Sequence, residues 1–291
     1  MQGITDNDTA PVVGGPSRTT DPPLLIVAHG SRDPRHPATV ALLAERMRTL
    51  RPDLTVRVCH LEFNLPGVAQ ALSGLYGAGE RRVIAVPLLL TRAFHAKTDI
   101  PGVLAEEVRG LPGLRVEQAD VLGPDLLLRA AMTRRLHEAG LSPAHHAETG
   151  VVLAAAGSSD PEAIAVIAET AREWRRAEGW CAVRPAFASA CPPTTADAVR
   201  ALRAEGVRRV AVAPYVIAPG RLPDRILRGA EEAGADVVAP VLGDAPELAR
   251  LLLSRYDAAL ARRVPRARRV GGRPVRGGAP GRLASVVRRY G

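Results

Sequence analysis

Residues 24–34 read LLIVAHGSRDP, and a close copy, GVVLAAAGSSDP, occupies residues 150–161. Each begins with an aliphatic run typical of a buried strand and continues through a Gly-Ser turn into a helical pattern. A second pair of segments repeats in the same way, because ERRVIAVPLLL at 80–90 matches VRRVAVAPYVI at 207–217. Both pairs are 127 residues apart, and this constant offset indicates two fused copies of one unit.

Within each copy, aliphatic runs alternate with helical patterns. The first copy predicts strands at 24–28, 55–61, 83–90 and 114–119 and helices at 37–50, 66–77, 99–109 and 124–139. The second predicts strands near 151–155, 181–187, 208–213 and 235–240 and helices near 161–178, 195–205, 222–233 and 246–260. Nearly continuous aliphatic strands suit a parallel sheet that is covered on both faces. We therefore expect an α/β fold of two tandem, doubly wound parallel-sheet lobes.

Composition then sets the limits of these lobes. We expect a disordered segment over 1–21, a first lobe over 22–141, a linker over 142–149, a second lobe over 150–260 and a disordered Arg/Gly/Pro-rich tail over 261–291. Ten arginines and no acidic residue lie in that tail, so the net charge of +9 describes the tail and not a binding face. Aromatic residues, at 3%, are too few for a platform that stacks nucleic-acid bases.

Two further classes of protein are excluded. No stretch reaches the ~18–20 uncharged apolar residues of a membrane span, and residues 1–21 lack the apolar core of a secretory signal. The three cysteines, Cys59, Cys181 and Cys191, form no CxxC pattern and fit a reducing compartment. We therefore expect a cytoplasmic protein with no membrane partner and no specific nucleic-acid partner.

Three metal-capable residues follow successive strands of the first copy. His29 ends the first predicted strand, Glu62 the second, and His95 lies in the loop after the third. Ligands of parallel α/β sheets bind at the carboxyl ends of the strands, so these side chains are expected to meet at one edge. Two imidazoles and a carboxylate suit a divalent first-row metal ion and leave positions open for another group.

The second copy serves as an internal control for this trio. Ala156, Ser189 and Leu222 stand where His29, Glu62 and His95 are expected, although the framework around them persists. Framework residues kept in the second copy are Gly157, Ser158, Asp160, Pro161, Pro193 and Pro214. The joint loss of the three metal-capable groups predicts one active half and one supporting half.

The other histidines are assigned plainer roles. His60 shares a strand face with Glu62 and is expected to be a partly buried strand residue, with a reserve ligand as the alternative. His36, His137 and the pair His145–His146 are expected to face solvent. The turn at Gly30 and Ser31 precedes a helix, and its amides could bind an anion. No nucleotide-binding glycine motif is present, so neither ATP nor a dinucleotide is indicated.

These residues together resemble a known family. AHGSRDP after the first strand, LEFNLP after the second and VPLLL with FHAKTDIP after the third are similar to the sirohydrochlorin chelatases of the CbiX/SirB type. The resemblance covers about 24–125, with 150–255 as a degenerate second copy. It implies two chelatase lobes that face a cleft and insert Fe²⁺ or Co²⁺ into sirohydrochlorin without ATP. The metal ion is then the substrate, and no permanently bound cofactor is expected.

The resemblance also assigns roles to residues. The family's metal-binding histidines fall on His29 and His95 and its acidic residue on Glu62, which implies one active site, in the first lobe. We expect the two histidines to hold the metal and then to accept protons, with Glu62 as third ligand or proton relay. Candidate partners for the eight substrate carboxylates are Arg32, Arg35, Arg92, Lys97 and the amides of Gly30 and Ser31. For each arginine the alternative is a solvated surface position.

An apolar wall for the ring has two candidates. They are Phe94 and the run PLLL at 87–90. For residues 87–90, burial in the hydrophobic core is the favoured interpretation. We favour ferrous iron as the metal, with a cobaltochelatase of cobalamin synthesis as the alternative, because this ligand set does not separate the two ions. A non-catalytic metal carrier, or a nucleic-acid-binding protein acting through the tail, are alternatives of other classes. The chain is expected to be a monomer with two pseudo-dimeric lobes.

Overall fold

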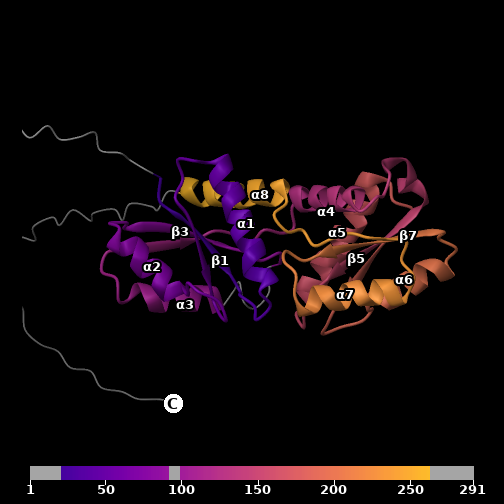
Figure 1. Cartoon of the computed structure of the whole chain (residues 1–291), viewed down its shortest axis with the longest axis horizontal. Coiled ribbons are helices and arrows are strands. Elements are labelled where there is room, and N and C mark those ends of the chain that lie inside the picture. Colours follow the sequence, from indigo (N-terminus) through magenta and orange to yellow (C-terminus); the bar gives the residue numbers. More distant parts are fainter. Residues whose placement is uncertain (1–20, 92–98, 263–291) are drawn as a thin grey trace, which may run out of the picture. The chain divides into compact units, whose positions relative to one another are not determined.

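The structure, a computed structural model, describes residues 21–91 and 99–262 and contains two four-stranded parallel sheets (Figure 1). The first sheet has the order β2-β1-β3-β4, with β1 (Leu24–Ala28), β2 (Val56–His60), β3 (Arg82–Pro87) and β4 (Arg115–Gln118). The second has the order β6-β5-β7-β8, with β5 (Thr149–Ala155), β6 (Ala182–Phe187), β7 (Arg209–Tyr215) and β8 (Val237–Val238). The expected pair of parallel α/β sheets is confirmed.

Helices follow the strands in the expected alternation. Those after the first four strands are α1 (Arg35–Leu50), α2 (Val68–Gly77), α3 (Ile100–Val108) and α4 (Leu126–Glu138). Those after the next four are α5 (Pro161–Glu178), α6 (Thr195–Ala204), α7 (Arg221–Glu232) and α8 (Pro246–Ala261). The segment predicted as a linker forms a short 3-10 helix, η2 (Pro143–Glu148). The predicted disordered segments lie outside the described residues except for Asp21, Ala261 and Arg262.

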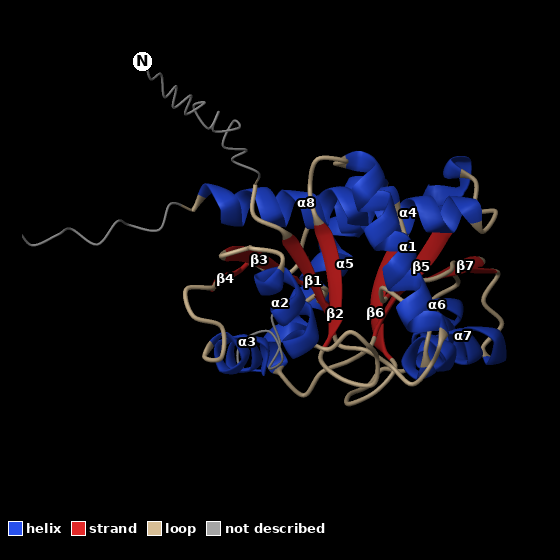
Figure 2. Ribbon diagram, turned by 60° about the vertical axis from the view of Figure 1, so that its left-hand side comes forward, coloured by secondary structure: helices blue, strands red, loops and turns tan. Residues whose placement is uncertain are grey.

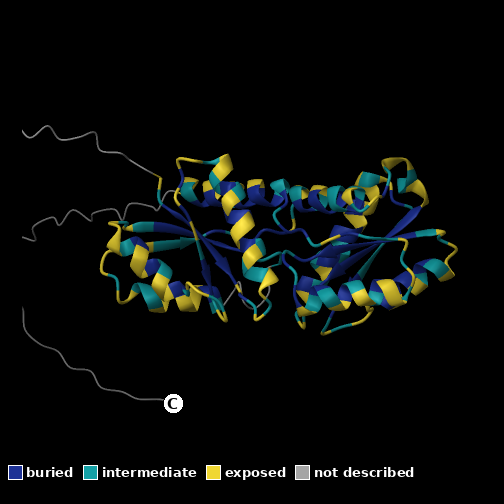
Figure 3. Cartoon of the chain, viewed as in Figure 1, coloured by how far each residue is buried: buried dark blue, intermediate teal, exposed yellow. Residues whose placement is uncertain are grey.

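The central strands of each sheet, β1, β3, β5 and β7, bury both of their faces, as their aliphatic composition requires (Figure 3). Leu24 and Ile26 of β1 belong to the core shared with α1 and α8, whereas Leu25 and Val27 point into a separate core under α2 and α3. In the second sheet, β5 alternates in the same way between the core with α5 and the core with α6 and α7.

The last helix of each half lies over the sheet of the other half. Figures 1 and 2 both show α8 beside β1 and β3. Helix α8 contacts α1 and β3, and α4 contacts β7 and packs along α8. One continuous hydrophobic core therefore includes Ile26 and Val86 of the first sheet together with Val151 and Leu153 of the second. The lobe boundaries at 22–141 and 150–260 stay a prediction.

Two arginines hold the crossing segments in place. Arg255 of α8 donates to the carbonyls of Val121 and Leu122 at 2.9 and 2.7 Å, just before the chain enters α4. Arg135 of α4 donates to the carbonyl of Leu242 at 2.7 and 3.1 Å, just before the chain enters α8. These bonds satisfy backbone carbonyls that the sheets leave unpaired. Across 21–91 and 99–262, no helix combines the length and the apolar character that a bilayer crossing demands.

Candidate functional site

The carboxyl ends of β1 and β2 bring two of the three predicted metal-capable residues together. The amide of Glu62 donates to the carbonyl of His29 at 3.0 Å, and that of Leu61 donates to the carbonyl of Ala28. Both His29 and Glu62 are exposed at this edge of the first sheet. His95, the third member, lies outside the described residues. The arrangement can present one imidazole and one carboxylate to an incoming metal ion.

A glycine makes this close approach possible. Gly30 has a φ of +93°, and a Cβ at this position would lie 1.9 Å from the carbonyl oxygen of Glu62. Any side chain would therefore separate the two strand ends that carry His29 and Glu62. Asn64 reinforces the contact, because its Oδ1 accepts from the Ser31 amide at 2.8 Å.

The second sheet repeats this backbone without the ligands. Gly157 has a φ of +96°, and a Cβ there would lie 2.0 Å from the carbonyl oxygen of Ser189. Phe63 and Ala190, also 127 residues apart, share a left-handed φ of 62° and 69°. The Ser189 hydroxyl donates to the carbonyl of Ala156 at 2.9 Å. The structure therefore places Ala156 and Ser189 where the first sheet carries His29 and Glu62.

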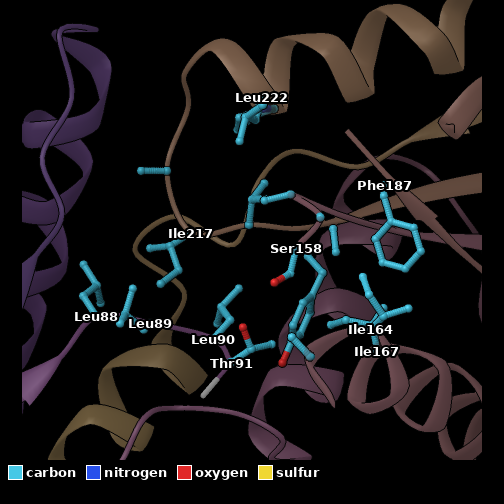
Figure 4. Close-up of a pocket in the computed structure, with 18 of the residues that line it drawn as sticks. Leu88, Leu89, Leu90, Thr91, Ser158, Ile164, Ile167, Phe187, Ile217 and Leu222 are labelled. Atoms are coloured by element: carbon cyan, nitrogen blue, oxygen red, sulfur yellow. The ribbon is translucent and has the colours of Figure 1, made fainter. Parts of the chain in front are cut away.

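A cavity of about 300 Å³ lies between the two sheets (Figure 4). From the first half it is lined by His36 and residues 88–91, and from the second by mostly apolar residues at the ends of β5, β6 and β7 and in the first turns of α5 and α7. The second-half lining includes Ala156, Phe187 and Leu222, and Leu89 and Leu90 line the cavity from the first half. Leu89 and Leu90 therefore line a pocket, while Leu88 is also buried in the core.

The predicted carboxylate-binding groups differ in what they already contact. Arg35 pairs with Asp33 and with Asp224 of α7, both at 2.6 Å, and these carboxylates raise the pKa of its guanidinium. In return, Arg35 lowers the pKa of Asp33 to about 2. Arg35 thus links the two halves, and its role toward a substrate carboxylate stays a prediction. The Ser31 amide is likewise occupied by Asn64.

Arg32 remains the best placed of these groups. It is exposed, and its guanidinium lies 5.1 Å from the centre of the Phe63 ring, in the loop that carries Glu62. Arg92, Phe94 and Lys97 lie outside the described residues. Gly30 serves the backbone contact described above.

Two further histidines lie near the site. His36, predicted to face solvent, is half-buried and lines the cavity from the first turn of α1. His60 is buried at the end of β2, 4% exposed, and its ring centre lies 6.5 Å from that of His36. Burial, with smaller contributions from His60 and His29, lowers the pKa of His36. In the described ranges, no three His, Cys, Asp or Glu side chains gather closely enough to form a complete metal cluster.

Comparison with known proteins agrees with this geometry. The sequence model of the CbiX family matches residues 23–139 and 150–259. A sirohydrochlorin ferrochelatase of Priestia megaterium is 26% identical over 242 residues, which span 82% of this chain and 90% of that protein. A sirohydrochlorin cobaltochelatase of the same organism is 27% identical over 208 residues, 70% of this chain and 66% of that protein. The solved structure of SirB from Bacillus subtilis with Fe³⁺ superimposes with a TM-score of 0.73 at 25% identity and covers 83% of this chain and 96% of that one.

Proposed function

We propose that this chain, which belongs to the CbiX family, is a sirohydrochlorin chelatase and that ferrous iron is the ion it inserts. One observation carries the proposal: His29 and Glu62 meet at a strand edge of the first sheet, and a largely apolar cavity opens between that sheet and the second. Metal-binding groups on one side and an apolar surface on the other suit a reaction between an ion and a flat organic ring.

Metal insertion requires both ligands and bases. The ion must be held, and two protons must leave the pyrrole nitrogens of the ring as it enters. A neutral imidazole can do either task, but one nitrogen cannot bind a metal and a proton at once. His29 therefore holds the ion first and becomes a proton acceptor only when the ion has moved into the ring. Glu62 beside it adds negative charge, as a further ligand or as the group that passes the proton to solvent.

The cavity supplies the surface for the ring. Its walls are aliphatic or aromatic, with Leu89 and Leu90 on one side and Phe187 and Leu222 on the other. Such a lining excludes water from the face of a macrocycle and leaves the carboxylates at the rim to meet arginine. Arg32, on the loop that follows β1 and beside the Glu62 loop, is the described group that we assign to this rim.

Iron is favoured over cobalt by similarity and not by ligand chemistry. The relative named as a ferrochelatase aligns with more of this chain than the cobaltochelatase of the same organism, 82% against 70%. Imidazole and carboxylate ligands do not separate Fe²⁺ from Co²⁺, since affinity follows mainly the ion itself. Cobalt insertion is the second candidate, and the cobaltochelatase relative supports it.

The test is anaerobic mixing of the protein with sirohydrochlorin and either Fe²⁺ or Co²⁺, followed by the change in the absorption spectrum. We expect His29→Ala and Glu62→Gln to lower the catalysed rate by at least ~100-fold, because each removes a group that acts directly on the ion or proton. Ala156→His, at the matching position of the second sheet, should leave the rate within about twofold. Full activity in both first-sheet variants would refute the assigned site.

Metal binding without any conversion of sirohydrochlorin would instead indicate a carrier. The ratio of the rates with Fe²⁺ and Co²⁺ then tests the choice of metal separately. A rate with Co²⁺ that exceeds the rate with Fe²⁺ at equal free concentrations would favour the cobaltochelatase candidate.

A further inference from the structure

Two imidazoles beside His29 carry buried ring nitrogens without a hydrogen bond to any described residue. These nitrogens are Nδ1 of His36 and both Nδ1 and Nε2 of His60. Burial lowers the pKa of His60, and the Pro66 backbone opposes that shift. Buried polar atoms are nearly always paired in folded proteins, so three orphaned nitrogens in one place call for an explanation.

The second half shows that the fold does not need these imidazoles. At the offset of 127 residues, His36 corresponds to Ala163 and His60 to Phe187, and both replacements are buried. The backbone is the same, since the His60 amide donates to Pro66 and the Phe187 amide donates to Pro193. An apolar residue satisfies this position without an orphaned nitrogen. The second half therefore lacks counterparts of His36 and His60 as well as of His29 and Glu62. In the first half all four residues occur together.

The separation of the two rings fits a shared metal ion. Their centres are 6.5 Å apart, with the ring planes inclined at 59°. A ring nitrogen lies about 1.1 Å from its centre, so two imidazoles that share an ion at the usual ~2.1 Å have centres roughly 5–6.5 Å apart. The observed separation lies at the upper end of that range.

We propose that His36 and His60 form a holding site for the divalent metal substrate, next to His29, from which the ion passes to the insertion site. Imidazole ligands select first-row ions of borderline softness, the class to which Fe²⁺ and Co²⁺ belong. Two protein ligands are fewer than the four of a closed structural site, so the ion is held weakly enough to leave. His36 also lines the cavity, which places one of the two ligands beside the space assigned to the ring. The transfer of the ion to the insertion site rests on the proposed chelatase function, whereas the binding of an ion by His36 and His60 does not.

The experiment counts bound cobalt after the insertion site has been removed. The starting protein carries His29→Ala, Glu62→Gln and His95→Ala, together with His146→Ala, because the His137–His146 pair would compete for the ion. Equilibrium dialysis with Co²⁺ under anaerobic conditions should find one weak site, with visible absorption bands of cobalt bound to imidazole. Adding His36→Ala and His60→Phe should abolish this binding, whereas adding His145→Ala should not change it.

The two substitutions copy residues that the second half already accommodates, Ala163 and Phe187. If His60→Phe still prevents folding, His36→Ala alone tests the holding site. The His36 side chain is only half-buried at the start of α1, so this substitution is expected to fold. Absence of cobalt from the starting protein, or binding that survives loss of both histidines, would overturn the holding site. In the otherwise unaltered chain, either substitution should raise KM for the metal by about tenfold with kcat within about twofold. If the unaltered chain had no chelatase activity, the proposed function would be contradicted, but the cobalt-binding result would still test the holding site.

Discussion

At the scale of single residues, Gly30 decides whether His29 and Glu62 can meet. It has a φ of +93°, and the carbonyl oxygen of Glu62 lies 1.9 Å from where a Cβ would stand. Gly157 meets the same restriction in the second half. Both glycines need a positive φ and room for a nearby carbonyl, but only Gly30 lies between residues that could bind a metal. Comparing substitutions at the two glycines therefore separates the effect of the turn on stability from its effect on metal binding.

We expect Gly30→Ala and Gly157→Ala each to lower the free energy of unfolding by about 2–3 kcal/mol, because both force strain and a displaced carbonyl. Urea unfolding measures that loss. Co²⁺ binding should be weakened by Gly30→Ala and kept by Gly157→Ala. Equal cobalt affinity in the two variants would contradict the role given to Gly30.

A second residue-scale feature is the histidine pair formed by α4 and η2. His137 Nε2 and His146 Nε2 are 3.0 Å apart, and His146 Nδ1 lies 3.0 Å from the carbonyl of Glu178. A carbonyl only accepts, so His146 donates through Nδ1 and, when neutral, accepts from His137 through Nε2. Burial and the neighbouring His146 lower the pKa of His137.

This pair predicts loss of stability in acid. In the unfolded chain the His137 side chain has the ordinary pKa of about 6.5, whereas its pKa in the folded protein is lower. The contribution of His137 to the free energy of unfolding is therefore complete above pH 6.5 and is lost as the pH falls through the folded pKa. The urea midpoint, followed by the fluorescence of Trp180 beside His146, should be lower at pH 5 than at pH 7.5. His137→Ala should reduce this difference, and an unchanged difference would rule out His137 as its source.

At the scale of elements, α4 and α8 are exchanged between the sheets and are held by Arg135 and Arg255. Each arginine donates at least two hydrogen bonds to backbone carbonyls of a crossing segment, and each is largely buried. Without the guanidinium, these carbonyls lose a charged donor in a place that water reaches poorly.

We expect Arg135→Met and Arg255→Met each to lower the free energy of unfolding by about 1.5–3 kcal/mol, the usual range for hydrogen bonds to charged groups. Methionine keeps the aliphatic stem and removes the donors. Arg172→Met on α5 is the control, because Arg172 is exposed and its guanidinium pairs with Glu169 of the same helix, so the change should stay within ~0.5 kcal/mol. Comparable losses at all three positions would argue against a special role for the crossing segments.

At the scale of the whole molecule, the cavity between the sheets is lined by second-half residues that correspond to histidines of the first half. Ala156, Ala163, Phe187 and Leu222 line it, and they correspond by the same offset to His29, His36, His60 and His95. At these four positions the second half carries apolar residues where the first half carries histidine. The two halves therefore differ in chemistry and agree in backbone.

A larger side chain in this cavity should weaken binding of sirohydrochlorin without weakening binding of the metal ion. We expect Leu222→Trp to raise KM for sirohydrochlorin at least ~10-fold while Co²⁺ affinity stays within about twofold, because the added bulk occupies the apolar lining. Leu42→Trp on the exposed face of α1 is the control and should change neither quantity. Loss of cobalt binding in Leu222→Trp would show that the cavity and the metal site are not separate.

The sequence alone determined the parallel α/β class, the order and near-limits of the strands and helices, the duplication and the meeting of His29 with Glu62. These follow from local periodicity, from the constant offset and from the rule that parallel strands end at one edge. Only the tertiary structure decided that α4 and α8 change sheets, that Arg35 pairs with Asp224, and that His36 turns toward His60. An amphipathic helix can cover either of two similar sheets, and a side chain near a strand end can face solvent or a neighbour. The choice in each case depends on contacts between residues far apart in the chain, which no local pattern records.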